Sequence, residues 1–563
     1  MWRQALSTAA ITMPNPGEGN ELPTPASTGA PAPPEQQDTT LVIVASSLGT
    51  VFEWYDFFVY GTLAVLLGNL FFPSDNESAA LLKSLAAFGV GFGVRPLGAI
   101  IFGHLGDLVG RKYTFLVTIT LMGIATAGVG LLPTYAEIGV WAPALLLLLR
   151  VLQGMALGGE YGGAAIYVAE HAPPGKRGFY TSFIQVSVVG GFMLSLAVVL
   201  GCTALLGKET FNEWGWRLPF LFSLLLLAIS LYIRLKLSES PVFQAMKAAG
   251  TTSKNPLKDS FAEPGNVKRI FVAMFGIAAG LTVIWYTAQF QTLYFLQQTT
   301  RIDTTTAQML IGLSTIIAAP SFVFFGWLSD KVGRKPPMIV GYGLTLLLLF
   351  PLFHMIANAG NPALAAAMER APVTIANVDC DYNPFAEKGQ NTECGKVLDY
   401  FAKQGVAYTK SAGSGVVSVT IGATKIQGLQ PDAFAAALQA AGYPGKVDPV
   451  KGWQVGPDPD GRSELRIIIA VILLGILSGM TYGPVAVILV ELFPARIRYT
   501  SMSIPYHIGT GYFGGFLPFV SQYIVVTTGN VFGGLWYTMA VVTVALLVTI
   551  FLLPETRGRD VSL

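Results

Sequence analysis

The sequence predicts an all-α membrane protein with twelve transmembrane helices in two pseudo-symmetric six-helix halves. Hydrophobic residues make up 52% of the 563-residue chain and charged residues only 12%, whereas soluble domains carry about 25% charged residues. Twelve apolar stretches approach the ~20 residues that a helix needs to cross hydrocarbon. A ten-residue motif also occurs once in each half of the chain, which indicates a duplicated unit.

Helices are expected because backbone groups inside a bilayer must find their hydrogen-bond partners within the protein. Lysine and arginine gather in the short loops on one side, which predicts that both termini and the central link are cytoplasmic. The apolar stretches lie at 41–70, 81–105, 114–132, 143–169, 179–205, 217–237, 269–298, 306–328, 337–357, 466–490, 500–526 and 531–553.

Composition divides the chain into seven parts. Residues 1–40 are rich in Pro, Ser, Thr, Gly and Ala, and they predict a disordered cytoplasmic tail because they cannot bury a core. The apolar run within this tail is broken by polar residues, which argues against a signal peptide. The other parts are a six-helix half over 41–237, a cytoplasmic linker over 238–268, helices seven to nine over 269–357, a periplasmic insertion over 358–465, helices ten to twelve over 466–553 and a cytoplasmic tail over 554–563.

The repeated motif has the pattern G-x-L-x-D-x-x-G-R-K and lies at 103–112 and 326–335. Each copy falls between two apolar stretches, where a membrane chain turns round on its cytoplasmic side. A second repeat pairs residues 158–170 with 479–491. In the second half, more residues separate the copy of the first motif from the copy of the second repeat than in the first half. The polar stretch 358–465 accounts for these extra residues.

The insertion itself is expected to be a small α+β unit. Residues 416–421 alternate as a strand does, and 431–442 read as a helix that ends at a glycine. Cys380 and Cys394 both lie in the insertion, on the oxidising side of the membrane. They either form a disulfide there or remain two free thiols in a loop.

Charged residues inside the apolar stretches are candidate functional groups, because each costs about 2.5–3.5 kcal/mol to insert. Glu53 and Asp56 lie three residues apart in the first stretch and so share one helix face. Two neighbouring carboxylates in a low dielectric do not both ionise readily, which suits a group that picks up and releases a proton. The alternative is a structural ion pair with an arginine of a neighbouring helix.

Two arginines and a third acid complete the intramembrane charges. Arg95 and Arg150 stay charged and form forked contacts with carboxylates, so each either binds an anionic substrate or pairs with a buried acid. Glu160 is a further candidate for proton coupling, because the second repeat places Thr481 at its position. A charge present in only one half is less suited to a symmetric scaffold role.

The second half offers neutral hydrogen-bonding groups instead of acids. Tyr286 and Gln289 lie in the seventh stretch, and Tyr506 and His507 in the eleventh. Such groups suit the recognition of a substrate. His507 could titrate near neutral pH, although a single buried histidine can also be no more than a hydrogen-bonded core residue.

Other function classes find no support. The sequence contains no nucleotide-binding P-loop, zinc motif or nucleophile elbow. It also contains no basic patch interleaved with aromatic residues. We therefore expect no enzymatic activity, no metal or other cofactor, and no nucleic-acid partner.

The doubled motif, R-x-x-Q-G at 150–154 and P-E-T-R-G at 554–558 resemble the major facilitator superfamily. Further motifs are similar to those of its metabolite:proton symporter family, whose members carry compounds such as citrate, shikimate, proline and betaine. These motifs are Glu53-Trp-Tyr-Asp-Phe57, Arg95-Pro-Leu-Gly98, Gly158-Gly-Glu-Tyr-Gly-Gly163, Ala169-Glu-His-Ala172, Glu239-Ser-Pro241 and Arg496-Ile-Arg-Tyr-Thr-Ser501. The insertion departs from the short loop that the family has between helices nine and ten.

The resemblance implies two halves that rock about a central site to give alternating access. It implies that Glu53 and Asp56 take part in proton coupling. It also implies a cytoplasmic latch, formed by Asp107 and Arg111 with Asp330 and Arg334.

The expected protein is thus a monomeric secondary transporter of a bacterial inner membrane that imports a small organic acid or zwitterion with protons. A uniporter or exchanger of the same fold is one alternative. A nutrient sensor built on a transporter fold is the other.

Overall fold

The computed structural model describes most of the chain beyond its first 38 residues. Every element named here belongs to the unit Asp38–Leu563. Residues 1–38 of the tail expected over 1–40 lie outside the described residues, as does the first part of the linker expected over 238–268, whereas Thr39 and Thr40 already belong to a helix. The described residues are 39–74, 77–109, 111–159, 161–235, 255–376, 380, 382–386, 390–413, 415–448, 452–456 and 459–559.

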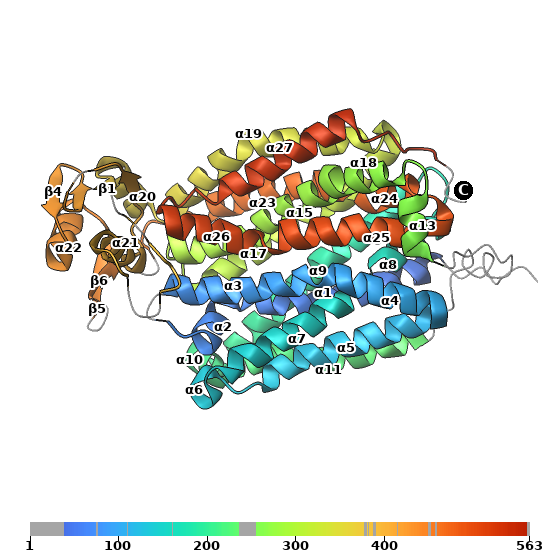
Figure 1. The fold of residues 1–563 in the computed structure, drawn as a ribbon, viewed down its shortest axis with the longest axis horizontal. Helices are drawn as coiled ribbons and strands as arrows, with labels where there is room; N and C mark the ends of the chain where they lie inside the picture. The colour runs from blue at the N-terminus through green and yellow to red at the C-terminus, as the bar shows by residue number, and fades with distance from the viewer. Residues whose placement is uncertain are drawn as a thin grey trace, which may run out of the picture. The chain divides into compact units, whose positions relative to one another are not determined.

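The first half is helical, as its long apolar stretches predict (Figure 1). Its helix ends agree with the expected ranges to within a few residues at most positions. The elements are α1 (Thr39–Thr62), α2 (Ala64–Phe71), α3 (Glu77–Gly93), α4 (Arg95–Val109), α5 (Arg111–Leu131), α6 (Tyr135–Ile138), α7 (Trp141–Leu157), α8 (Tyr161–His171), α9 (Arg177–Leu206), α10 (Lys208–Thr210), the π-helical η1 (Phe211–Gly215) and α11 (Arg217–Leu235).

The second half repeats this helical organisation around the inserted residues. Its elements outside the inserted residues are α13 (Pro256–Ala262), α14 (Asn266–Val272), η2 (Ala273–Ala279), α15 (Gly280–Tyr286), η3 (Thr287–Gln291), α16 (Thr292–Tyr294), η4 (Phe295–Thr299), α17 (Thr304–Ala318), α18 (Pro320–Val332), α19 (Lys335–Gly360), α23 (Glu464–Tyr482), α24 (Val485–Leu492), the 3₁₀ turn η5 (Ala495–Ile497), α25 (Arg498–Ile508), η6 (Gly509–Gly515), α26 (Leu517–Thr528) and α27 (Leu535–Phe551).

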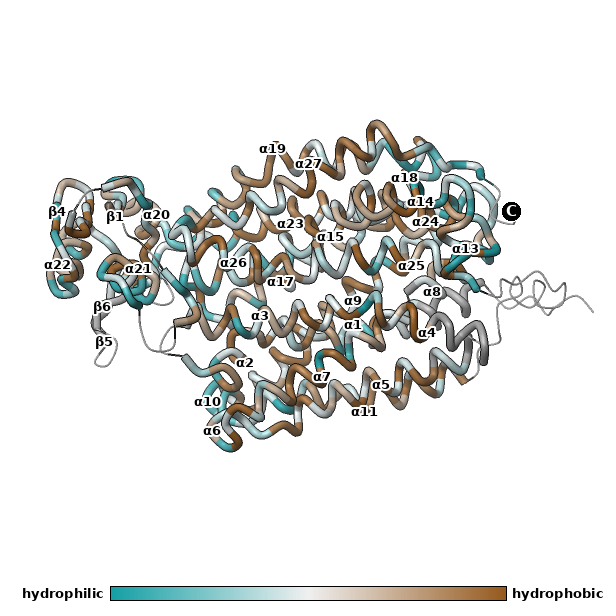
Figure 2. The backbone as a smooth tube through the Cα atoms, in the orientation of Figure 1, coloured by the Kyte–Doolittle hydropathy of each residue, from teal (hydrophilic) through white to brown (hydrophobic). Residues whose placement is uncertain are grey.

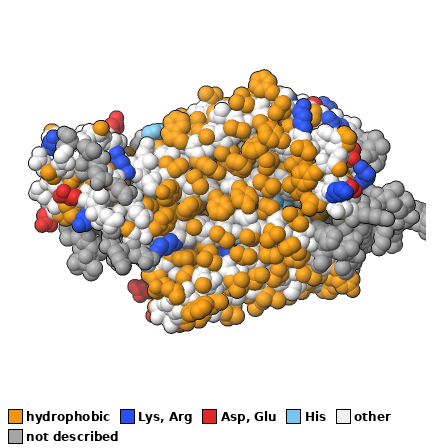
Figure 3. Space-filling model, viewed as in Figure 1, with side chains coloured by type: hydrophobic (Ala, Val, Ile, Leu, Met, Phe, Trp, Pro, Cys, Tyr) orange, Lys and Arg blue, Asp and Glu red, His pale blue; other side chains and the backbone are white. Residues whose placement is uncertain are grey.

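Several of these helices are long and apolar enough to cross a membrane. Among the described residues seven meet that test alone, and up to nine do if each of two bent pairs forms one span. Figure 2 shows apolar sequence along the helices and hydrophilic sequence towards both ends. Figure 3 shows apolar side chains over the visible face of the helices, with charged side chains gathered at the two ends. Such an apolar belt suits contact with lipid.

The expected first helix is bent where the sequence predicts a continuous one. The helices α1 and α2 meet at 61° on either side of Leu63. Just before the bend, the carbonyl of Gly61 accepts a hydrogen bond from the Tyr294 hydroxyl of the second half at 2.8 Å. A Cβ on Gly61 would lie 2.6 Å from the Phe290 ring, so this close approach requires glycine.

The expected seventh helix contains three π-helical segments, η2, η3 and η4. Hydropathy does not reveal such segments, because they leave the apolar pattern unchanged. Wider turns of this kind are frequent at functional sites in helices. Here η3 directly follows Tyr286 and contains Gln289.

The residues between α19 and α23 carry short strands and helices. Their elements are α20 (Pro362–Arg370), β1 (Val373–Ala376), α21 (Glu393–Gln404), β2 (Thr409–Ser411), β3 (Ser418–Ile421), β4 (Thr424–Gln427), α22 (Pro431–Ala440), β5 (Gly445–Asp448) and β6 (Gly452–Val455). They lie at one end of the helical bundle, and α13 lies at the other (Figure 1). We call these the insertion end and the opposite end.

Strand pairing gives the inserted residues a core of their own. The sheet order is β2-β1-β3-β4, with β1 and β2 parallel and the other pairs antiparallel. Val419 and Phe401 are fully buried, because alternate strand residues and one face of α21 point to the same interior. The structure joins Cys380 and Cys394 in a disulfide, with their Cα atoms 5.0 Å apart.

Candidate functional site

Arg95 lies at the interface between the two halves. It is the first residue of α4, after the break in the second expected helix, and its side chain is fully buried. Its Nη1 donates to the Thr510 hydroxyl of η6 at 3.4 Å, whereas Nε and Nη2 have no hydrogen-bond partner among the described residues. Its Cζ lies 5.3 Å from the centre of the Trp54 ring, a distance typical of cation–π contacts.

Neutral polar groups of the second half lie within electrostatic range of this guanidinium. Tyr286, Tyr482 and Tyr506 interact electrostatically with Arg95, and so does His507. We call these five residues the central polar cluster. It joins an arginine of the first half to three phenols and an imidazole of the second.

Several atoms of the central polar cluster make no hydrogen bond within the described protein. The Tyr286 hydroxyl and both ring nitrogens of His507 are buried without a partner. The hydroxyl groups of Tyr482 and Tyr506 lie 3.4 Å apart. Buried polar groups are hydrogen-bonded in the large majority of cases, so this concentration of unpaired atoms makes the cluster a candidate site for a polar ligand.

Gln289 differs from the unpaired residues of the central polar cluster, because its side chain already makes a hydrogen bond within the protein. Its Oε1 accepts a hydrogen bond from the Thr315 hydroxyl at 2.8 Å. Both residues belong to the second half, so this contact fixes the amide within one half.

Aromatic rings fill the interface between the cluster and the insertion end. Phe58 of α1 stacks on Trp285 with 5.0 Å between ring centres. Phe92 of α3 meets Tyr286 edge to face at 5.5 Å. Farther on, the Gln308 side chain donates to the Thr62 carbonyl at 3.2 Å. These contacts hold the two halves together on that side of the cluster.

Contacts towards the opposite end also join the halves. The Tyr499 hydroxyl donates to the Gly159 carbonyl at 2.7 Å. Arg498 and Glu170 form an ion pair at 3.6 Å, and both side chains are buried. The central polar cluster is therefore enclosed by contacts between the halves on both sides.

Arg150 lies within the first half and has different surroundings. Its Nη1 donates to the Gln153 amide oxygen at 2.7 Å, and its Cζ lies 4.2 Å from the Phe57 ring centre and 4.5 Å from that of Tyr60. No carboxylate is its partner among the described residues. Its contacts are those of a packed cation, held by aromatic faces.

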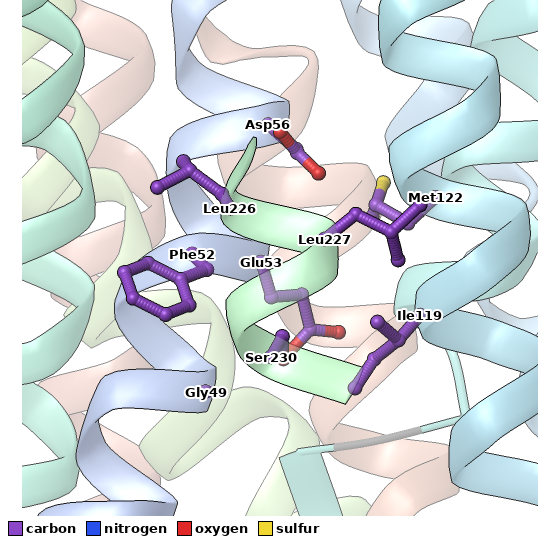
Figure 4. A pocket seen from close by; sticks show the side chains of 9 residues that line it. All are labelled: Gly49, Phe52, Glu53, Asp56, Ile119, Met122, Leu226, Leu227 and Ser230. Carbon is purple, nitrogen blue, oxygen red and sulfur yellow. The ribbon is translucent and has the colours of Figure 1, made fainter. Parts of the chain in front are cut away.

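Glu53 and Asp56 line one small cavity between α1, α5 and α11 (Figure 4). Their exposed fractions are 7% and 5%. The cavity measures about 10 Å³, close to the smallest volume that holds one water molecule. Its other lining residues are Gly49, Phe52, Ile119, Met122, Leu226, Leu227 and Ser230.

This carboxylate pair is placed apart from the central polar cluster. The cavity is walled by helices of the first half alone. Asp56 Oδ1 has no hydrogen-bond partner among the described residues, and Glu53 interacts electrostatically with Arg95. The structure thus brings the two acids together as their spacing predicts, with Glu53 as the member coupled to the cluster.

Three other candidates lie outside the described residues. Glu160 is one of them, and nothing further is said of its structure. The side chains of Asp107 and Arg111 are the others, although their backbones belong to the end of α4 and the start of α5. Their roles stay predictions.

The second copy of the repeated motif joins the halves at the opposite end. Asp330 accepts hydrogen bonds from the backbone N–H groups of Gly178 and Phe179 at 2.9 and 2.8 Å. These amides belong to the first turn of α9, so a carboxylate of the second half sits at a helix N-terminus of the first. Arg334 donates to Asp330 at 2.6 Å and to Glu491 at 2.9 Å, which holds the carboxylate in place.

Asp330→Asn is expected to loosen this contact. A neutral amide loses the charge–dipole attraction, worth up to about 2 kcal/mol at a partly buried helix end, so exchange of the Gly178 and Phe179 amides should quicken roughly tenfold. Hydrogen–deuterium exchange of peptides that contain these residues measures the change. Asp432→Asn, an exposed acid in the first turn of α22, is the matched control. Unchanged exchange at both amides would contradict the role of Asp330.

Glu555 ties the C-terminal residues to the same region. Burial acts to raise the pKa of its carboxyl, but backbone N–H groups of Arg334, Arg557, Lys335 and Thr556 outweigh burial and leave that pKa below its usual value. The carboxylate accepts from Arg334 N at 2.9 Å. A lowered pKa in the folded state means that the ionised carboxylate stabilises the fold.

The ionised Glu555 carboxylate should contribute to the free energy of unfolding at pH values above its unfolded-state pKa. This contribution should vanish as the pH falls through its lower folded-state pKa. We expect wild type to unfold at a higher temperature than Glu555→Gln at pH 7. The difference should shrink to zero at acidic pH. Thermal unfolding of both proteins from pH 7 to pH 3 tests this. A difference that stays constant with pH would show that the charge of Glu555 is irrelevant.

Sequence reasoning missed several residues of the site. Thr510 is uncharged and belongs to none of the motifs, and Tyr482 is uncharged. One signal was available for Tyr482, since the second repeat pairs it with Tyr161. The same repeat pairs Glu170 with Glu491, and each of these acids forms a buried ion pair in the structure.

Comparison with known proteins identifies the family. The model of the family described as "Sugar (and other) transporter" matches residues 41–275 and 459–563. The chain belongs to this family, within the major facilitator superfamily. The gap between the two matched segments contains all but the last few residues of the insertion expected over 358–465, and the resemblance drawn from the motifs is confirmed.

The relatives of this major facilitator superfamily member are transporters rather than enzymes. The inner membrane metabolite transport protein YhjE of Escherichia coli K12 is 39% identical over 342 residues, which cover 58% of this chain and 74% of YhjE. The proline/betaine transporter of Salmonella typhimurium is 39% identical over 322 residues, or 56% of this chain and 64% of that protein.

A solved structure shares the fold. The proton:xylose symporter XylE, bound to 6-bromo-6-deoxy-D-glucose, matches with a TM-score of 0.60 over 93% of this chain and 98% of that chain. Identity is 16%, so the likeness concerns the fold alone. Together with the apolar helices, it shows that this is a multi-pass membrane protein of the transporter fold.

Proposed function

We propose that this protein is a proton-coupled secondary transporter that carries a small organic acid or zwitterion across the bacterial inner membrane by alternating access. The observation that supports this most is Arg95. It is a fully buried guanidinium at the interface of the halves, with two nitrogens that have no partner among the described residues. A guanidinium binds carboxylates through paired hydrogen bonds, and the relatives' names include carriers of a metabolite and of proline or betaine.

The remaining groups of the central polar cluster suit the rest of such a substrate. Tyr286 and His507 offer neutral hydrogen-bonding atoms that are free of protein partners among the described residues. The Trp54 and Phe92 rings near Arg95 offer π faces, which also attract the cationic end of a zwitterion. Because the cluster draws on both halves, a bound substrate would stabilise the enclosed state that joins them.

Proton coupling is assigned to Glu53 and Asp56. Their cavity adjoins helices of the first half only, so a proton can bind there without competing for the substrate's place. The electrostatic interaction of Glu53 with Arg95 supplies a link between the two sites. Neutralising Glu53 changes the field at Arg95 and hence its attraction for an anion.

The proposed membrane topology has twelve spans. The seven long helices, the two bent pairs, the two shorter apolar helices Leu116–Leu131 and Leu535–Phe551, and the α25–η6–α26 run account for them. Both termini then lie in the cytoplasm, the small α+β insertion lies in the periplasm, and the protein acts as a monomer in the bilayer.

Proteoliposome uptake of a panel of labelled carboxylates and betaines tests the proposal. One or more compounds should accumulate when a proton gradient is imposed, and accumulation should stop when the gradient is collapsed. Uptake that equilibrates regardless of the gradient would favour the uniporter or exchanger. Binding without any uptake would favour a nutrient sensor.

A further inference from the structure

The inserted residues contact both halves of the helical bundle at the insertion end. They leave the second half at the end of α19 and rejoin it at the start of α23, so their covalent attachment is to the second half alone. The two connections lie side by side, because the Ser463 N–H donates to the Ala359 carbonyl at 2.8 Å. Any hold of the insertion on the first half must therefore come from non-covalent contacts.

A tyrosine fixes the insertion against α26 of the second half. The Tyr408 hydroxyl donates to the Val526 carbonyl at 3.3 Å, and its backbone N–H donates to the Gly529 carbonyl at 3.1 Å. A Cβ on Gly529 would lie 2.4 Å from the Tyr408 ring, and the positive φ of 73° at this position also favours glycine. Phe385 stacks on Tyr523 of α26 with 6.3 Å between ring centres. These contacts hold the insertion in a defined place on the second half.

A leucine of α3 supplies the contact with the first half. Leu82 is fully buried, and it belongs to the hydrophobic core of the insertion. It is the one described residue of the first half in that core, whereas Leu81 and Leu85 of the same helix belong to the core of the bundle. The insertion helix α21 packs against α3, and Ser78, one turn before Leu82, lines the same cavity as Tyr408. The insertion therefore covers one side of α3.

Separation of the halves at this end would uncover Leu82. It lies in the second turn of α3, so water that enters an opening at the insertion end reaches it. Burial of a leucine side chain is favourable because it removes apolar surface from water. The ion pair between Lys208 of α10 and Asp303 also joins the halves at this end (Figure 1), but the Lys208 side chain is 61% exposed, and exposed ion pairs contribute little to stability. The leucine contact is the stronger of these two holds.

We propose that the insertion is a strap that holds the two halves together at the insertion end, with Leu82 as the residue that it grips. This role rests on the proposed function, because alternating access requires the insertion end to open in one state. Opening requires Leu82 to leave the core of the insertion, or the insertion to leave α26. Both events lose favourable contacts, so the strap shifts the protein towards states that are closed at this end.

Distances between the two halves test the strap without a substrate or a proton gradient. Spin labels are attached through Ala136→Cys in α6 and Thr304→Cys in α17, two exposed positions in the two halves. Cys202→Ser removes the free thiol from this background. Double electron–electron resonance on the full chain in lipid nanodiscs then gives the distribution of distances. Leu82→Ala should raise the ratio of long to short distances about tenfold, whereas Leu82→Met, which keeps an apolar side chain of similar volume, should stay within about twofold of wild type.

A matched control separates the strap from a general loss of packing. Leu146→Ala removes an equally buried leucine from α7, which packs against α3, α4, α5 and α6 of the first half. It should lower the unfolding temperature and leave the distances unchanged. An equal lengthening in Leu146→Ala and Leu82→Ala would overturn the strap.

A second variant acts on the other side of the insertion. Tyr408→Ala releases the insertion from α26, so it should also lengthen the distances, and it decides the matter if Leu82→Ala does not fold. Unchanged distances in a folded Leu82→Ala, or in Tyr408→Ala where Leu82→Ala does not fold, would overturn the strap. Longer distances without uptake of any substrate would retain the strap and remove the transport proposal. Uptake with unchanged distances would remove the strap alone.

Discussion

Replacing Arg95 by lysine is expected to lower the uptake efficiency for a carboxylate substrate roughly 100-fold. Lysine keeps the charge but replaces a planar fork by a point charge. One charge-assisted hydrogen bond to a buried carboxylate is worth about 1.5–3 kcal/mol, and about 1.4 kcal/mol changes a rate tenfold, so losing the fork accounts for about two orders of magnitude. The lysine ammonium also cannot keep the Thr510 contact at 3.4 Å while it reaches the substrate.

The measurement is the initial rate of uptake in proteoliposomes against substrate concentration. Arg150→Lys is the matched control, since Arg150 is equally buried but contacts Gln153 and aromatic rings of its own half. That variant should unfold at a lower temperature while its KM for the substrate stays within about threefold of wild type. A wild-type KM and rate in Arg95→Lys would remove Arg95 from the binding site.

The contrast between these two arginines shows how far sequence could lead. From the sequence, both are charged residues in apolar stretches, and the same two interpretations apply to each: contact with a substrate or an ion pair with a buried acid. Their environments differ because Arg95 starts a helix at the interface of the halves, whereas Arg150 packs between helices of one half. Hydropathy places both residues in apolar segments, but it does not say which face of a helix meets the other half.

Residue spacing and hydropathy predicted the features that depend only on residues close together in the sequence. Glu53 and Asp56 share a helix face by their spacing alone, and they line the same cavity. The helix ranges followed from the length of each apolar stretch. By contrast, the bend at Leu63 and the π-helical segment beside Tyr286 leave the apolar pattern unchanged, so hydropathy does not predict them.

Glu53→Gln and Asp56→Asn are expected to separate accumulation of substrate from its exchange. Each amide imitates the protonated acid permanently, so a variant at the coupling position cannot release a proton during the transport cycle. Exchange of internal for external substrate requires no net proton movement and should survive. Accumulation driven by a proton gradient should fall to the level set by passive equilibration in at least one of the two variants.

Both activities are measured in the same proteoliposomes, with and without an imposed proton gradient. Met122→Leu is the control, because it alters the wall of the same cavity without removing an acid, and it should accumulate substrate normally. Glu53 is the stronger candidate of the pair, since its charge interacts with Arg95 and proton binding there would change the electrostatic field at the proposed substrate site. If both variants still accumulate substrate against its gradient, the coupling acid lies elsewhere, and Glu160 becomes the next position to replace.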